Sequence, residues 1–291
     1  MSEKLLHYDI IERLGEGAGS VIYAVRDPQT GRKFAMKHVV RHKDKDVRFI
    51  EQMENEYEVS RNFTHPNLRR SYELKVVKTL LLKKAEAFLV MELFDGKSLE
   101  ARPPSSLLEV TDAFIPAAQG LHAMHKMGYI HCDIKPNNIL RDTSGHVKVI
   151  DFGQSVKLGT IKERIQGTPD YIAPEQVERR PVMVQTDVYN LGATIYWCLT
   201  GKPIPTQYTV SKKGENSFLL DTLIATPQTL NPGVPNALSN LVMECVSTSW
   251  KKRPADMEQF INRLELVRHV IVKGMQPQVP SESPAEGSAP A

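Results

Sequence analysis

The stretch that decides the fold is His131-Cys132-Asp133-Ile134-Lys135-Pro136-Asn137-Asn138. It places a carboxylate at Asp133, a cation two residues later at Lys135, and an amide oxygen five residues later at Asn138. A carboxylate in this setting can orient and deprotonate a hydroxyl group, and a lysine can neutralise charge on a transferred phosphoryl group. An amide oxygen is a hard ligand of the kind that Mg²⁺ accepts. The stretch therefore indicates phosphoryl-transfer chemistry.

A second stretch follows at 147–153, with the sequence Val-Lys-Val-Ile-Asp-Phe-Gly. It predicts a short strand that ends in the carboxylate of Asp151. Asp151 and Asn138 are 13 residues apart and can flank one metal site across a hairpin. Either stretch alone can be an ordinary polar loop, but their order along the chain argues against coincidence.

Two features upstream suggest a phosphate site. Gly15-Glu16-Gly17-Ala18-Gly19-Ser20 lies between two apolar strand segments, and glycines let backbone amides approach a phosphate closely. A glycine-rich turn can also be purely structural. Lys37 lies in an apolar strand, where a lysine is costly to bury unless it is paired. Its partner can be a phosphate or the carboxylate of Glu56, or Lys37 can extend along the surface to reach water.

With Ala173-Pro174-Glu175, these segments resemble the five ordered motifs of the eukaryotic-type (Hanks-type) serine/threonine protein kinases, a family also found in bacteria. The resemblance covers about residues 8 to 270. It implies an α+β, bilobal fold, with a small lobe over 1–94 that holds a five-stranded antiparallel β-sheet and one helix. A larger, mainly α-helical lobe follows over 95–272. We expect residues 273–291, with four prolines and three serines, to form a disordered tail.

The resemblance implies catalytic roles for five residues. Asp133 would be the catalytic base, and Lys135 would contact the γ-phosphate. Lys37 would hold the α- and β-phosphates and pair with Glu56. Thr168 would bridge Asp133 and Lys135 near the substrate hydroxyl. The substrate would be a protein with a serine or threonine acceptor, because the run 133–138 together with Thr168 matches the serine/threonine pattern. The tyrosine-specific pattern places an arginine in this loop instead of Lys135.

The resemblance also implies ATP as co-substrate and Mg²⁺ as its metal, the latter held by Asn138 and Asp151. Met91 would gate the back of the nucleotide pocket. The full set of expected ATP contacts is Leu14, Gly15, Glu16, Gly17, Ala18, Gly19, Ser20, Ile22, Ala35, Lys37, Met91, Glu92, Phe94 and Leu140. The alternative function is that of a pseudokinase, an ATP-binding regulatory scaffold.

Three departures from the family pattern bear on regulation. Ser20 stands where the third glycine is usual, so we expect altered ATP affinity. Cys132 replaces the arginine that often binds a phosphate on the activation loop, so we expect basal activity without that phosphorylation. Ser60, four residues after Glu56, replaces a large apolar residue, so the Glu56 helix should be loosely packed. An activating partner or a dimer at that helix, and a gain in activity in Ser60→Leu, would follow.

The composition excludes several other classes of protein. Hydrophobic residues make up 41% and charged residues 24%, and the net charge is +3, so we expect no nucleic-acid partner. No apolar run approaches the roughly 20 residues of a membrane span, and the N-terminal residues do not resemble a secretory signal. Three widely spaced cysteines favour a reducing, cytoplasmic location. Lysines at 75, 78, 83 and 84 predict a solvated edge strand or a docking surface.

Overall fold

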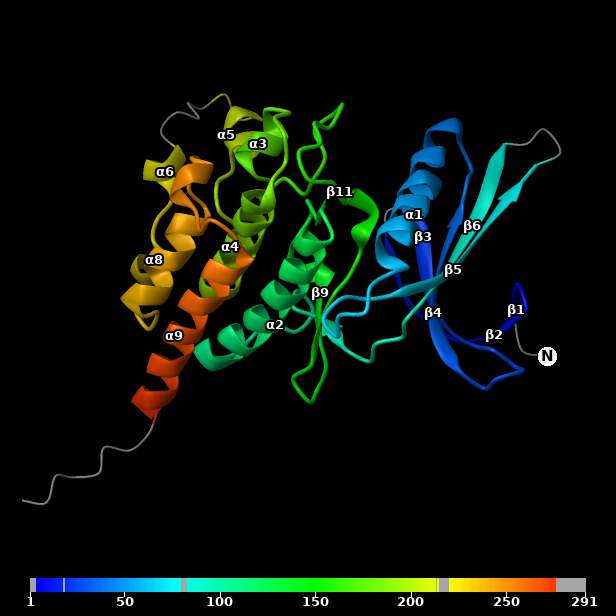
Figure 1. Ribbon diagram of the computed structural model, residues 1–291, viewed down its shortest axis with the longest axis horizontal. Helices are drawn as coiled ribbons and strands as arrows, with labels where there is room; N and C mark the ends of the chain where they lie inside the picture. The colour runs from blue at the N-terminus through cyan, green and yellow to red at the C-terminus, as the bar shows by residue number, and fades with distance from the viewer. Residues whose placement is uncertain (1–3, 18, 80–82, 213, 215–219, 276–291) are drawn as a thin grey trace, which may run out of the picture.

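The computed structural model describes residues 4–17, 19–79, 83–212, 214 and 220–275. Figure 1 shows two lobes, a β-rich lobe near the N-terminus and a helical lobe that ends in α9. This arrangement confirms the predicted α+β, bilobal fold. Most of the predicted 273–291 tail lies outside the described residues. Helix α9, however, continues to Met275, so the first residues of that segment are helical.

The small lobe is built on an antiparallel sheet in the order β1-β2-β3-β4-β6-β5. Strand β3 (Ser20–Arg26) pairs along its full length with β4 (Lys33–Val40) and forms a hairpin with it. The sheet has six strands and not five, since the two residues of β1 pair with the start of β2. The other strands are β1 (Lys4–Leu5), β2 (Tyr8–Gly17), β5 (Ser71–Lys78) and β6 (Lys84–Met91).

One long helix, α1 (Val47–Ser60), covers a face of this sheet after the single turn η1 (Asp44–Asp46). Ile50 and Met53 of α1 are fully buried and pack in one cluster with Val39 of β4 and Leu89 of β6. This apolar stripe recurs every three to four residues, which is the spacing of one helix face. The stripe fixes which side of α1 faces the sheet, and therefore where Glu56 points.

Three helices form the frame of the large lobe. They are α2 (Leu107–Lys126), α4 (Val184–Thr200) and α9 (Met257–Met275). Helix α2 is continuous through Pro116, because its buried face stabilises it despite the missing amide hydrogen bond. Helix α4 is buried nearly all round and ends at Gly201, whose φ of 69° is the left-handed conformation expected at a helix C-terminus.

Shorter elements complete the large lobe. The helical segments are α3 (Pro174–Val177), α5 (Gln207–Lys212), α6 (Leu220–Leu223), α7 (Pro227–Leu230), α8 (Asn236–Cys245) and η5 (Trp250–Lys252). Among the described residues, no helix is long and apolar enough to cross a membrane.

Short strands at the junction of the lobes position the functional loops. They are β7 (Lys97–Ser98), β8 (Tyr129–Ile130), β9 (Ile139–Arg141), β10 (Val147–Val149) and β11 (Val156–Lys157). Strand β8 pairs with β11, and β9 pairs with β10. The stretch 131–138 and the stretch 150–155 are therefore held side by side.

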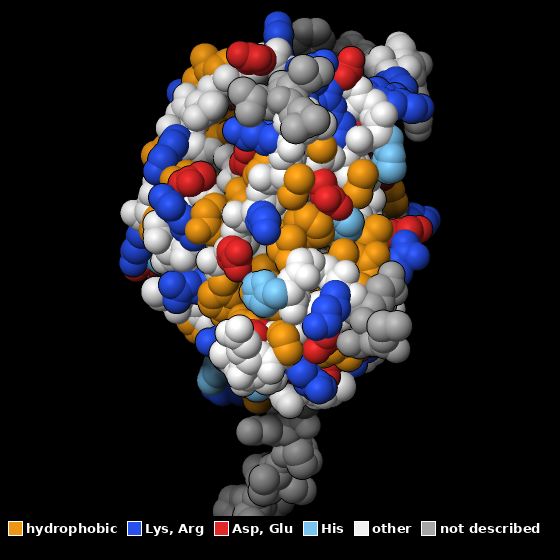
Figure 2. Space-filling model, turned by 90° about the vertical axis from the view of Figure 1, so that its right-hand side faces the viewer, with side chains coloured by type: hydrophobic (Ala, Val, Ile, Leu, Met, Phe, Trp, Pro, Cys, Tyr) orange, Lys and Arg blue, Asp and Glu red, His pale blue; other side chains and the backbone are white. Residues whose placement is uncertain are grey.

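Figure 2 shows the small-lobe end of the molecule. Lysine and arginine side chains on this face are interspersed with acidic and apolar ones, and they form no continuous basic surface there. Within the predicted lysine cluster, Lys84 forms an ion pair of 2.5 Å with Glu54 of α1.

Candidate active site

The loop 131–138 is held in place by a buried carboxylate of helix α4. Asp187 accepts hydrogen bonds from the backbone amides of His131 and Cys132, both at 2.8 Å, and lies 2.8 Å from the His125 Nε2. Burial raises the pKa of Asp187, but the His125 bond and the His131 amide outweigh it and hold the pKa below its usual value. Cys132 is held at a φ of 66°, a strained conformation for a residue with a side chain. This strain turns the chain so that the next residue, Asp133, is presented to the cleft.

Asp133, Lys135 and Thr168 form a closed network. The Thr168 hydroxyl donates to Asp133 Oδ1 at 2.8 Å, and Lys135 Nζ donates to Asp133 Oδ2 at 3.0 Å. Lys135 Nζ also lies 2.9 Å from Thr168 Oγ1. The turn η2 (Pro136–Asn138) follows directly and returns the chain towards β9. The sequence therefore named three residues that the fold brings into mutual contact from positions up to 35 residues apart.

Asn138 and Asp151 lie on the same cavity and offer two oxygen ligands. Asn138 Nδ2 donates to the Asp133 carbonyl at 2.8 Å, which orients the amide oxygen away from that contact. The Ile150 amide donates to the Asn138 carbonyl at 3.0 Å and ties the two segments together. Lys37 lowers the pKa of the Asp151 carboxyl to about 2, so Asp151 is ionised at neutral pH.

This donor set fits Mg²⁺. Among the described residues, no cluster of three or more His, Cys, Asp or Glu side chains could hold a metal by itself. A Mg²⁺ ion does not need such a cluster, because it is commonly bound by one or two protein oxygens with waters and substrate phosphates. One carboxylate at Asp151 and one amide oxygen at Asn138 match that pattern.

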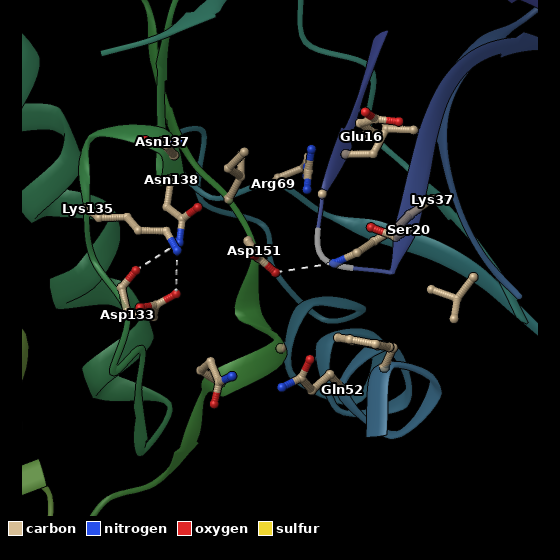
Figure 3. Close-up of a pocket in the computed structure, with 17 residues that line it drawn as sticks. Glu16, Ser20, Lys37, Gln52, Arg69, Asp133, Lys135, Asn137, Asn138 and Asp151 are labelled. Carbon is tan, nitrogen blue, oxygen red and sulfur yellow. Dashed lines mark hydrogen bonds and ion pairs between the residues drawn. The ribbon is translucent and has the colours of Figure 1, made fainter. Parts of the chain in front are cut away.

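Lys37 is paired inside the cleft and does not extend to the surface. Its Nζ lies 2.7 Å from Glu56 Oε2. It also lies 3.3 Å from Asp151 Oδ1, as Figure 3 shows. Burial lowers the pKa of Lys37, but the two carboxylates outweigh that effect and raise it. The lysine therefore keeps its charge and links helix α1 to the segment that carries Asp151.

The cavity between the lobes has a volume of about 390 Å³. Figure 3 shows Lys37 and Asp151 meeting near its centre, with Asp133 and Lys135 on one side and Glu16 and Ser20 on the other. Nine predicted site residues line it: Glu16, Gly17, Ser20, Ile22, Lys37, Asp133, Lys135, Asn138 and Asp151.

The glycine-rich segment forms the end of the β2–β3 hairpin, where Gly17 is paired with Ser20. Gly19 has a φ of 76°, and a Cβ there would lie 2.5 Å from the Phe49 ring of α1, so only glycine fits. Gly15 has no atom within 4 Å of a virtual Cβ and faces open space. Ala18, also predicted to contact ATP, lies outside the described residues.

Among the expected ATP contacts, Ile22 lines this cavity. Leu14, Ala35, Met91, Glu92, Phe94 and Leu140 do not. Ala35 and Met91 are buried partners on the adjacent strands β4 and β6. The Glu92 carboxylate pairs with Lys148 at 2.5 Å, and the Glu92 amide donates to the Arg70 carbonyl at 2.9 Å. The Phe94 ring lies against Gly96, where a Cβ would be 2.5 Å from it.

The expectation that Ser60 leaves the Glu56 helix loosely packed is wrong. Ser60 is fully buried, and its hydroxyl bonds the Glu56 carbonyl and the Ser71 hydroxyl, both at 2.6 Å. The apolar contact with Phe152 is made instead by Phe63, whose ring centroid lies 4.9 Å away in an edge-on arrangement. Phe63 lies three residues after the end of α1 and belongs to none of the family motifs, so the motifs alone do not predict this contact.

Sequence reasoning missed Phe49 and Arg69, which line the cavity, and also Asn55 and Lys162, which contact the segment after Asp151. Asn55 of α1 donates to the backbone carbonyls of residues 152, 153 and 155 at 3.3, 3.2 and 2.8 Å. Arg69 is 6% exposed and lines the cavity. The only signal for Arg69 is an arginine in the stretch Asn67-Leu68-Arg69-Arg70, just before a strand.

Cys132 is buried among apolar side chains and is not reactive. It packs with Ile130 and Val182, and burial raises the pKa of its thiol. Nearby, Lys162 is 7% exposed and donates to the Gln154 carbonyl at 2.7 Å. A buried lysine thus ties residue 162 to the start of the loop that follows Asp151.

A family model described as the protein kinase domain matches residues 8–264. The chain belongs to the protein kinase family. This kinase domain is similar to a probable serine/threonine-protein kinase of Clostridium acetobutylicum, with 25% identity over 270 residues, 90% of this chain and 40% of that protein. It is also 29% identical over 268 residues to a probable serine/threonine-protein kinase of Corynebacterium efficiens. That alignment covers 87% of this chain and 39% of that protein.

A eukaryotic relative is also found. The kinase domain is 27% identical over 249 residues to cAMP-dependent protein kinase type 3 of Saccharomyces cerevisiae, with 84% of this chain and 60% of that protein covered. The chain thus spans about two fifths of the length of the two bacterial relatives.

Proposed function

We propose that this chain is a serine/threonine protein kinase that transfers the γ-phosphoryl group of Mg-ATP to protein hydroxyl groups. The observation that carries the proposal is the Asp133–Lys135–Thr168 network at the mouth of a cavity that also holds Lys37 and Asp151. The names of the bacterial relatives agree with this activity. The catalytic residues lie together, so the geometry gives the scaffold alternative no support.

In this proposal each side chain acts from the position described. Asp133 accepts the proton of the substrate hydroxyl as its oxygen forms a bond to the γ-phosphorus, and the bond to the β–γ bridging oxygen breaks. Lys135 neutralises charge on the transferred group. Thr168 holds the second Asp133 oxygen and so fixes the direction of the first. When bound, Mg²⁺ would neutralise the phosphate oxygens, and Asn138 and Asp151 would hold it.

The pairing of Lys135 with Thr168 supports a serine or threonine acceptor. Lys37, held by Glu56, would contact the α- and β-phosphates, and the backbone at Gly15 and Gly17 would lie over them. Ser20 lines the same cavity. We expect Ser20→Gly to lower the KM for ATP, and an unchanged KM would contradict a role of Ser20 in nucleotide affinity.

We further propose that basal activity does not require phosphorylation of the loop after Asp151. The Cys132 side chain is apolar and buried, so it cannot pair with a phosphate. Lys162 instead anchors the loop through the Gln154 carbonyl. The activating partner expected at the Glu56 helix is not part of this proposal, because its reason was the packing gap at Ser60.

The proposed location is a reducing compartment such as the cytoplasm. Cys132, Cys198 and Cys245 are all free thiols, and burial raises their pKa values and makes each a poor nucleophile.

The test is transfer from labelled Mg-ATP to the chain and to a generic basic protein, followed by phosphoamino-acid analysis. We expect phosphoserine or phosphothreonine from the wild type and from Glu258→Gln, an exposed carboxylate on α9. We expect none from Asp151→Asn or Asp133→Asn. Transfer that persists in both aspartate variants, or phosphotyrosine as the product, would contradict the proposal.

A further inference from the structure

Arg69 is a buried cation at the back of the cleft. It follows helix α1, lies just before β5, and lines the cavity shared with Lys37 and Asp151 (Figure 3). Its backbone amide donates to the Val149 carbonyl at 3.0 Å, which anchors it to the strand that leads into Asp151. A buried arginine is costly unless a negative charge lies nearby.

The negative charge nearest to Arg69 is that of Glu56. Arg69 Nη2 lies 3.6 Å from Glu56 Oε1, while Lys37 holds the other carboxylate oxygen at 2.7 Å. Glu56 is 1% exposed, and its Oε1 accepts no hydrogen bond from any residue that the structure describes. Arg69 is therefore the charge that faces this oxygen.

The four charges at the back of the cleft balance as two cations, Lys37 and Arg69, and two carboxylates, Glu56 and Asp151. Lys37 is shared between both carboxylates. When ATP contacts Lys37, its phosphates share the lysine with Glu56, and a buried carboxylate whose counter-charge is weakened is destabilised. Arg69 can meet that need, because its guanidinium stays charged and its backbone is fixed on β10.

We propose that Arg69 is a positioning residue that holds Glu56, and with it helix α1, while Lys37 serves the phosphates of ATP. This inference rests on the proposed kinase function. Arg69 does not act on the reacting atoms; it acts through Glu56. The consequence is that Arg69 should contribute to ATP affinity only in the presence of the Glu56 carboxylate.

The test compares Arg69→Met with Arg70→Met in the full chain. Arg70 is exposed, and its guanidinium contacts the Arg61 carbonyl and the Tyr72 ring, outside the cavity. We expect Arg69→Met to weaken equilibrium binding of ATP and to raise its KM by about five- to tenfold, with kcat changed less than twofold. Arg70→Met should leave both values within twofold. A general loss of folded enzyme would lower kcat and leave KM unchanged, which would contradict the proposal.

The decisive step is to repeat the substitution in Glu56→Gln. If Arg69 acts through Glu56, Arg69→Met should weaken ATP binding less than twofold in that background. An equal factor in both backgrounds would overturn the proposal and assign to Arg69 a direct contact with the nucleotide. If Arg69→Met does not fold, Arg69→Gln and Arg69→Lys replace it: the lysine variant should keep the affinity that the glutamine variant loses, and equal losses would overturn the proposal.

Binding and transfer separate this inference from the proposed function. A wild-type chain that binds ATP and transfers no phosphate would contradict the proposed function, and the binding comparison at Arg69 would still decide the role of that residue.

Discussion

The substitution Ser60→Leu distinguishes two descriptions of the helix that carries Glu56. The family resemblance predicts that a leucine would fill a gap and raise activity. The structure places the Ser60 hydroxyl 2.6 Å from the Ser71 hydroxyl, with the Ser60 side chain fully buried. Since Phe63 already packs on Phe152, a leucine at 60 has no gap to fill. We therefore expect Ser60→Leu to lower both stability and activity.

The magnitude follows from two costs. Forcing extra methylene groups into a packed site costs typically 1–3 kcal/mol. Leaving the buried Ser71 hydroxyl without its partner costs about 1–3 kcal/mol. The unfolding free energy of Ser60→Leu should therefore fall by about 2–6 kcal/mol. Ser60→Ala carries only the second cost, and the Ser60→Ala/Ser71→Ala double variant should be more stable than Ser60→Ala, because neither position then holds an unpaired hydroxyl.

The assay is urea unfolding of the four proteins, with phosphate transfer measured well below each midpoint. An unchanged m-value would assign the shift in midpoint to stability alone. The reasoning is refuted if Ser60→Leu unfolds at the wild-type urea concentration and transfers phosphate faster. That result would mean that the site has room for a leucine and that the prediction from the family pattern was right.

Three further predictions concern charged side chains. Lys162→Met removes a buried hydrogen bond within the loop after Asp151, so activity should fall and limited proteolysis at that loop should speed up; equal proteolysis rates would contradict the anchor. Arg253→Met leaves Glu175 buried without the two hydrogen bonds of 2.8 and 3.0 Å that Arg253 donates, and thermal unfolding should show a loss of about 3–5 kcal/mol; a loss below 1 kcal/mol would refute this. The pKa of Asp151 is lowered to about 2 from its usual 3.8, chiefly by Lys37. Its contribution to stability is therefore complete above pH 4 and lost as the pH falls from 4 to 2; in Lys37→Met this acid-dependent loss should shrink, and an identical loss in both proteins would contradict the pairing.

Much of the fold follows from local patterns. Helix α4 and its end at Gly201 follow from the sequence, because buried helical faces and a C-terminal glycine are properties of consecutive residues. The hairpin of β3 and β4 follows in the same way from the turn residues at 27–31. Strand β1 was missed because its two residues carry no pattern of their own and are defined only by pairing with β2.

The residues of the candidate site also fall into those that local patterns predict and those that only the fold reveals. Asp133, Lys135, Asn138 and Asp151 were named from short motifs whose chemistry can be read from residue type and spacing. Arg69 carries no motif, and its role depends on a carboxylate that lies 13 residues earlier in the chain and on a strand 80 residues later.

The sequence by itself determined the family, the ordered motifs and the residues expected to perform phosphoryl transfer, because these are encoded in segments of a few residues. Only the tertiary structure decided that Ser60 bonds to Ser71, that Phe63 packs on Phe152, and that a second cation faces Glu56. The physical reason is that burial and pairing depend on which residues the fold brings together. The free energy of burying a serine or an arginine depends on the partner that another segment of the fold supplies, and not on the neighbours along the chain.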